Sequence, residues 1–132
     1  MNRRNTHQKQ IIAAAITGQG VHRTAEEVLA IARREEPGIG LATVYRNLNL
    51  LAEQKQIQKF SVNGTAVYDG NPEPHDHLFC TRCGQLYDIA GFYDDAMDHE
   101  TASKNHVRIL RHSVLYEGIC EECLKKEEMT WN

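Results

Sequence analysis

Apolar residues recur at helical spacing in three stretches of the first half of the chain. The first stretch predicts a helix over residues 6–17. The second follows a T-x-x-E capping box at Thr24 to Glu27 and ends at Pro37. The third predicts a helix over residues 41–54. Its expected buried face consists of Leu41, Val44, Leu48 and Leu51.

The period then changes from helical to alternating. Residues 57–62 and 65–68 alternate in polarity around Asn63-Gly64, which predicts a β-hairpin. Three helices followed by a hairpin are typical of a winged helix-turn-helix. The polar residues of the third helix should turn away from its apolar face, where they could bond phosphates and base edges: Thr43, Tyr45, Arg46, Asn47 and Asn49. A small helical bundle with a solvated third helix is the alternative.

The segment Asn71-Pro72-Glu73-Pro74 is a short, stiff connector. It predicts a winged-helix domain over residues 1–70, a hinge over 71–74 and a second domain over 75–132. The expected elements of the second domain are strands over 77–80, 85–89 and 107–116, a helix over 94–105 and a short helix over 124–129. The fold class is therefore α+β.

Charge differs between the two halves. Residues 1–60 carry nine Lys and Arg against five Asp and Glu, whereas residues 61–132 carry six against thirteen. A basic half joined to an acidic half favours a polyanion-binding module coupled to a cation-binding one, although an accident of surface composition is the alternative. No apolar run approaches the ~20 residues of a membrane span, and no signal-type segment follows the N-terminus, so we expect a cytoplasmic protein.

All four cysteines form C-x-x-C pairs, Cys80 with Cys83 and Cys120 with Cys123. Two such pairs predict one tetrahedral zinc site that clamps the second domain. An iron–sulfur cluster, a redox dithiol and free buried cysteines are the alternatives.

A second group of possible ligands contains no sulfur. His75 and His77 alternate on a predicted strand and point to one side. Asp69 precedes them and Asp88 lies on the neighbouring predicted strand. Each residue alone is more simply a surface aspartate or a satisfied histidine, but together they suit iron, manganese or zinc.

Three segments resemble the ferric-uptake-regulator (Fur) family of metal-dependent repressors: G-L-A-T-V-Y-R-N-L at 40–48, H-D-H-L-F-C-T-R-C-G at 75–84 and Y-E-G-I-C-E-E-C at 116–123. The resemblance implies a homodimer that binds double-stranded operator DNA. It also implies an N-terminal winged helix and a small α/β dimerisation domain with a four-cysteine structural zinc site. Tyr45 and Arg46 would contact DNA. The implied ligands of a regulatory metal are His22, Asp69, His75, His77 and Asp88.

The two aspartates make the ligand set most similar to the peroxide-sensing (PerR) branch, because iron-uptake repressors usually carry glutamate at the positions of Asp69 and Asp88. In that branch bound Fe²⁺ reacts with hydrogen peroxide and a ligand histidine is oxidised, by resemblance His22 or His75. Metal loss then ends repression, whereas Mn²⁺ in the same site is not oxidised. No spare cysteine exists for the sensory site of a zinc-uptake repressor.

Asp76, Asp95 and His112 match part of an additional metal site in other branches, although Pro74 stands where those branches often carry a histidine. The sequence thus favours a metal-dependent repressor over two other classes. A metalloenzyme would need a general base beyond the ligands, and none is evident. A zinc-ribbon interaction module would not bind DNA.

Overall fold

The structure, a computed structural model, describes residues 3–18, 20–89 and 94–130. The chain divides into two compact units, one over residues 1–72 and one over residues 73–132. Over these described residues the first unit contains three helices and a three-stranded sheet, and the second contains another three-stranded sheet and two helices.

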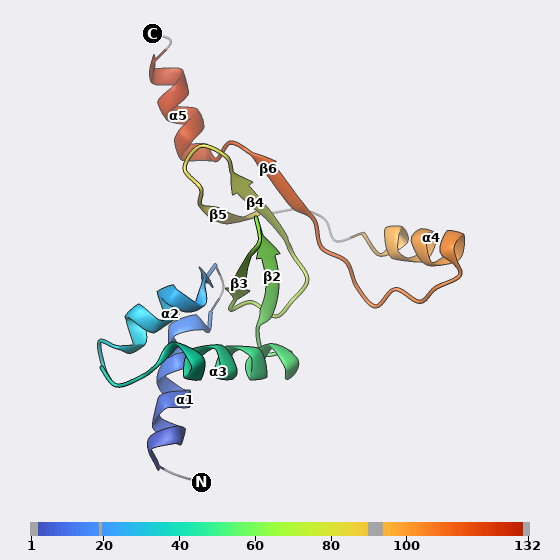
Figure 1. The fold of residues 1–132 in the computed structure, drawn as a ribbon. Helices are drawn as coiled ribbons and strands as arrows, with labels where there is room; N and C mark the ends of the chain where they lie inside the picture. Colours follow the sequence, from blue (N-terminus) through green and yellow to red (C-terminus); the bar gives the residue numbers. More distant parts are fainter. Residues whose placement is uncertain (1–2, 19, 90–93, 131–132) are drawn as a thin grey trace. The chain divides into compact units, whose positions relative to one another are not determined.

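The first unit is built from the predicted helices and hairpin (Figure 1). Helices α1 (Arg3–Ile16), α2 (Ala25–Ala32) and α3 (Leu41–Glu53) precede strands β2 (Gln58–Val62) and β3 (Thr65–Asp69). Asn63 and Gly64 connect the two strands with φ of 51° and 81°, as a type I′ turn requires. This order confirms the predicted winged helix-turn-helix and argues against a purely helical bundle.

The predicted capping box begins α2. The Thr24 hydroxyl accepts a hydrogen bond from the Glu27 amide at 3.2 Å, and the Glu27 carboxylate accepts one from the Thr24 amide at 3.0 Å. Both amides would otherwise lack a partner at the helix start. The first helix begins at Arg3, earlier than predicted, and α3 ends close to the expected position.

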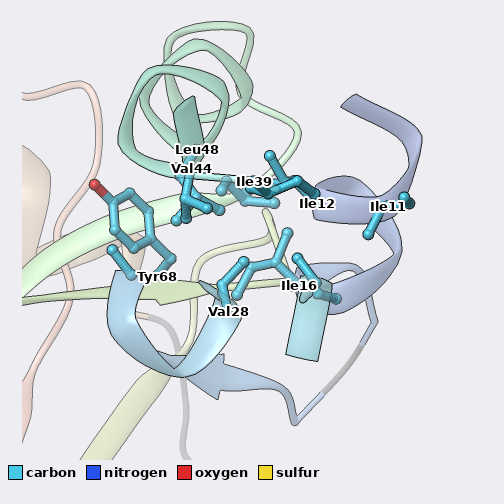
Figure 2. Packing of buried hydrophobic residues seen from close by; sticks show 12 residues of the cluster. Ile11, Ile12, Ile16, Val28, Ile39, Val44, Leu48 and Tyr68 are labelled. Carbon is cyan, nitrogen blue, oxygen red and sulfur yellow. The ribbon is translucent and has the colours of Figure 1, made fainter. Parts of the chain in front are cut away.

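The core of the first unit lies where the three helices meet β3. Figure 2 shows Ile12 and Ile16 of α1, Val28 of α2, and Val44 and Leu48 of α3 converging with Ile39 and Tyr68. The expectation that Leu41 is buried is wrong, because its side chain is 36% exposed. Ile39, just before the helix, is fully buried and occupies the core at this end of α3.

A two-residue strand, β1 (His22–Arg23), was not predicted. It pairs antiparallel with β3, so that His22 lies opposite Asp69 and Arg23 opposite Tyr68. The Gly70 amide donates to the Val21 carbonyl at 2.9 Å, and the Arg23 guanidinium donates to the Ala15 carbonyl. A strand this short has no periodicity to detect, which is why sequence patterns miss it.

Strand β4 (Asp76–Cys80) is the centre of the second sheet. It pairs antiparallel with β5 (Leu86–Ile89) and parallel with β6 (Leu115–Gly118). Helix α4 (Asp95–Asn105) begins at the Asp94 cap, and α5 (Glu121–Thr130) follows β6. These elements agree with the predicted ones except in one segment.

The predicted strand over residues 107–116 is mostly wrong. Only its C-terminal end, Leu115 and Tyr116, belongs to β6, which pairs with His77–Cys80 of β4. Two apolar residues upstream are exposed, Val107 to 52% and Leu110 to 85%. The alternating apolar residues therefore do not form part of a sheet within the described residues.

Candidate metal centres

The four cysteines converge in the second unit from two distant segments. Cys80 ends β4, Cys83 lies in the turn after it, and Cys120 and Cys123 flank the start of α5. The Sγ atoms of Cys80 and Cys123 are 3.8 Å apart, as are those of Cys83 and Cys120. A tetrahedron with zinc–sulfur bonds of ~2.3 Å has sulfur–sulfur edges of about 3.8 Å. The cluster therefore fits the predicted structural zinc, and none of the four cysteines forms a disulfide.

Backbone amides prepare one of these sulfurs to bind a cation. The amides of Cys83 and Cys120 point at Cys80 Sγ from 3.5 and 3.4 Å and lower the pKa of the Cys80 thiol to about 6. The hydrogen bond to Cys120 and burial raise the pKa of Cys123 to about 12. Four sulfurs this close cannot all ionise unless a cation neutralises them.

The first unit contributes one histidine–aspartate pair. Because β1 and β3 place His22 opposite Asp69, His22 Nε2 lies 3.2 Å from Asp69 Oδ2. The two side chains are 8% and 0% exposed. Asp69 Oδ1 accepts the Asn71 amide at 2.8 Å, which orients the carboxylate. A carboxylate this deeply buried requires a cationic or hydrogen-bonding partner.

The second unit contains a separate group of two histidines and one aspartate. In the β4–β5 register His77 lies opposite Asp88, and Asp88 Oδ1 is 3.4 Å from His77 Nε2 and 3.2 Å from His75 Nε2. The two imidazole rings lie 4.4 Å apart between centroids. His75 Nδ1 donates to the Glu73 carbonyl at 2.6 Å, because a carbonyl oxygen can only accept. A neutral ring that donates through Nδ1 carries its lone pair on Nε2, and Nε2 is then the atom that could bind a metal.

The residues predicted for an additional metal site do not meet. The carboxylate of Asp76 accepts the Val114 amide at 3.0 Å and is buried, whereas Asp95 is exposed on α4. His112 pairs through Nδ1 with Asp98, a residue that sequence reasoning missed. Asp98 follows Asp95 by almost one helical turn, so spacing alone does not choose between them. Among the described residues no metal-ligand group contains Asp76, Asp95 or His112.

The residues of α3 that were predicted to face DNA differ in their exposure to solvent. Arg46 is exposed, with its guanidinium 3.5 Å from the Thr43 hydroxyl. Tyr45 is half-buried against the core, and its hydroxyl lies 3.4 Å from the Glu26 carboxylate. The expectation that Asn47 turns away from the core is wrong, because the residue is buried and donates to the Thr43 carbonyl at 2.9 Å. Asn47 follows Val44 by three residues, so it lies on the same side of the helix as Val44.

A polar cleft of about 410 Å³ lies between α1 and α3. It contains two cationic side chains, those of Lys9 and Arg46, which would attract an anionic ligand. The residues that line it are Asn5, Gln8, Lys9, Thr43, Arg46 and Asn47.

A winged helix joined to a unit with a four-cysteine cluster and histidine–aspartate groups defines a class, the metal-responsive DNA-binding regulators. The ferric uptake regulator family model matches residues 1–117, and the chain belongs to this family. Members of this family are transcription regulators, so this chain is a regulator and not an enzyme. The second C-x-x-C lies beyond the matched residues. Among the described residues no helix has the length and apolarity needed to cross a membrane.

Individual relatives agree with this assignment. The chain is 34% identical to the ferric uptake regulation protein of Bacillus subtilis over 111 residues, which cover 80% of this chain and 74% of that protein. The peroxide stress regulator of Campylobacter jejuni is 28% identical, with a TM-score of 0.69 over 91% of each chain. The ferric uptake regulator of Helicobacter pylori has the same fold, with 23% identity and a TM-score of 0.70 over 89% of this chain and 80% of that one.

Proposed function

We propose that the protein is a homodimeric, metal-dependent repressor that binds palindromic operator DNA and senses hydrogen peroxide through oxidation of a histidine ligand. The observation that carries this proposal is the pair of sulfur-free groups, His22 with Asp69 in one unit and His75, His77 and Asp88 in the other. The proposed location is cytoplasmic, because a reducing compartment keeps paired C-x-x-C motifs available for a metal.

One ion shared by both groups would explain why each is incomplete alone. The first offers one imidazole and one carboxylate, and the second offers two imidazoles and one carboxylate. Three nitrogens and two oxygens together suit Fe²⁺ or Mn²⁺, which prefer such ligands to thiolates. The segment 71–74 would then be a hinge that the ion restrains, and metal would favour the arrangement that binds DNA.

The DNA interface would centre on α3. Arg46 is its exposed cation, and Lys9 of α1 lines the same polar cleft. A reading helix in each subunit of a dimer requires two half-sites at a matching spacing, which makes the operator palindromic. Phosphate contacts from the basic first half would set the affinity and its salt dependence.

The aspartates distinguish the peroxide-sensing branch. These five ligands would hold Fe²⁺, which would supply one-electron chemistry toward hydrogen peroxide and so expose His22 and His75 to a radical oxidant. His22 and His75 hold their Nε2 atoms beside aspartate carboxylates, within reach of an ion bound there. An imidazole that gains oxygen would be a poorer ligand, the ion would leave, and repression would end. The similarity to the Campylobacter jejuni peroxide stress regulator supports this choice.

The test compares Fe²⁺- and Mn²⁺-loaded protein before and after mild peroxide. We expect both forms to retard operator DNA in a gel shift, and only the iron form to lose binding after peroxide. Peptide mass spectrometry should then find one added oxygen atom on His22 or His75. His7 and His99, both exposed, are internal controls for radical diffusing in solution.

Loss of binding with oxidation confined to methionine or cysteine would contradict the peroxide mechanism. An iron form that still binds DNA after peroxide would favour the alternative, an iron- or manganese-responsive uptake repressor. The DNA interface is tested separately. Arg46→Ala should weaken operator binding roughly tenfold or more with metal uptake unchanged. Arg34→Ala, an exposed arginine after α2, should change it much less.

A further inference from the structure

The sulfur atoms of the cysteine cluster differ in accessibility. Cys80, Cys120 and Cys123 are buried, whereas Cys83 is exposed. Cys83 is therefore the sulfur at which an oxidant or a chelator can first attack. The side chain beside Cys83 is that of Tyr87, an aromatic residue that lies outside both C-x-x-C motifs.

Tyr87 of β5 lies against the cluster. Its side chain packs on the three buried cysteines, and its hydroxyl is 3.7 Å from Cys83 Sγ. A zinc-bound cysteine carries no proton, so in the loaded site the hydroxyl must be the donor and the sulfur the acceptor. The Cys80 sulfur accepts hydrogen bonds from two backbone amides. The Tyr87 hydroxyl gives the Cys83 sulfur a comparable hydrogen-bond donor.

This hydrogen bond has a chemical consequence. Four thiolates around one Zn²⁺ leave excess negative charge on the sulfurs, and a donor draws part of that charge away. A sulfur with less available charge is a weaker nucleophile. The tyrosine ring also occupies space beside the cluster that a reagent would need.

We infer that Tyr87 is a positioning residue of the zinc site, which protects the exposed Cys83 from oxidative release of the metal. The inference rests on the assignment of zinc to the four cysteines. A repressor that senses peroxide needs such protection, because the signal molecule is itself an oxidant of thiolates.

The reaction that Tyr87 slows has two steps. The Cys83 sulfur attacks hydrogen peroxide, a sulfur–oxygen bond forms, the oxygen–oxygen bond breaks and hydroxide leaves, which yields a sulfenic acid. The thiolate of Cys120, whose Sγ is 3.8 Å away, then displaces hydroxide from this sulfur and forms a disulfide. Two of the four ligands are consumed, and zinc is released.

The test uses the full chain loaded with zinc alone, as wild type and as Tyr87→Phe. Zinc release during peroxide treatment is followed with a colorimetric zinc indicator. We expect release to be roughly three- to tenfold faster in Tyr87→Phe, as for the loss of one ordinary hydrogen bond. Tyr116→Phe, on exposed β6 in the same unit, should behave as wild type.

A second measurement separates the hydrogen bond from general stability. With Co²⁺ in place of zinc, the sulfur-to-metal charge-transfer band should shift in Tyr87→Phe but not in Tyr116→Phe, a change that altered stability alone would not produce. Equal zinc-release rates or an unshifted band would overturn the role of Tyr87 while leaving the zinc site intact. Wild-type protein that binds no zinc would instead refute the site itself.

Discussion

Gly70 has the least room for a side chain among the described glycines. It follows Asp69 at the end of β3, and a Cβ atom there would lie 2.0 Å from the Ile16 carbonyl oxygen. The carbonyl oxygen and amide nitrogen of Gly18 would be only 2.5 and 2.8 Å away. All three are backbone atoms of the end of α1 and the turn after it, so no side chain can rotate to make room. We predict that Gly70→Ala forces β3 away from α1.

The cost can be worked from these contacts. Relieving them requires shifts of about 1 Å or more, and such overpacking typically costs about 1–3 kcal/mol. Losing the Gly70 amide bond to Val21 adds about 1 kcal/mol. The reduced freedom of alanine in the unfolded chain returns roughly 0.5 kcal/mol. The net loss is about 1.5–3.5 kcal/mol, which lowers the melting temperature of a domain this size by roughly 6 °C or more.

Thermal unfolding followed by circular dichroism measures this loss. Gly38→Ala is the matched control, because its Cβ would meet only the Arg4 guanidinium at an ordinary 3.6 Å. Manganese binding should also weaken in Gly70→Ala, since β3 holds Asp69 opposite His22. A Gly70→Ala protein that melts within about 2 °C of Gly38→Ala would refute the close approach of the backbones.

Three further predictions concern other contacts. Thr24→Ala removes the side-chain cap of α2 and should cost about 1 kcal/mol of stability, measured by urea unfolding. Zinc binding at about pH 8 should release protons, measured by calorimetry in several buffers. Cys80, with a pKa of about 6, is already ionised at this pH, whereas Cys123, with a pKa of about 12, must lose its proton to bind zinc. The apparent zinc affinity should therefore rise with pH, and a proton count of zero would contradict this. Tyr68→Phe removes a 2.8 Å hydrogen bond to Asn49 of α3 and should cost about 1 kcal/mol; a variant as stable as wild type in urea would show that the bond contributes nothing.

Local signals in the sequence were sufficient for most elements. The capping box, the Asn63-Gly64 turn and the helical spacing of Val44 and Leu48 each act over a few residues, so they predict structure without knowledge of the rest. The four cysteines were equally informative, because the C-x-x-C spacing presets half of a tetrahedral site. The sequence-based prediction failed where a segment must pair with residues that are distant in the sequence. The segment from Val107 has strand-like alternation, but upstream of Leu115 it pairs with no strand of the described chain.

The sequence by itself therefore determined the fold class, the cysteine cluster and the ligand types, since these follow from short-range periodicity and spacing. Only the tertiary structure decided how residues far apart are paired. It placed His22 beside Asp69 through a two-residue strand, joined His112 to Asp98 instead of Asp95, and set the Tyr87 hydroxyl against Cys83. Such pairings depend on strand register and on side-chain packing, which no local pattern encodes.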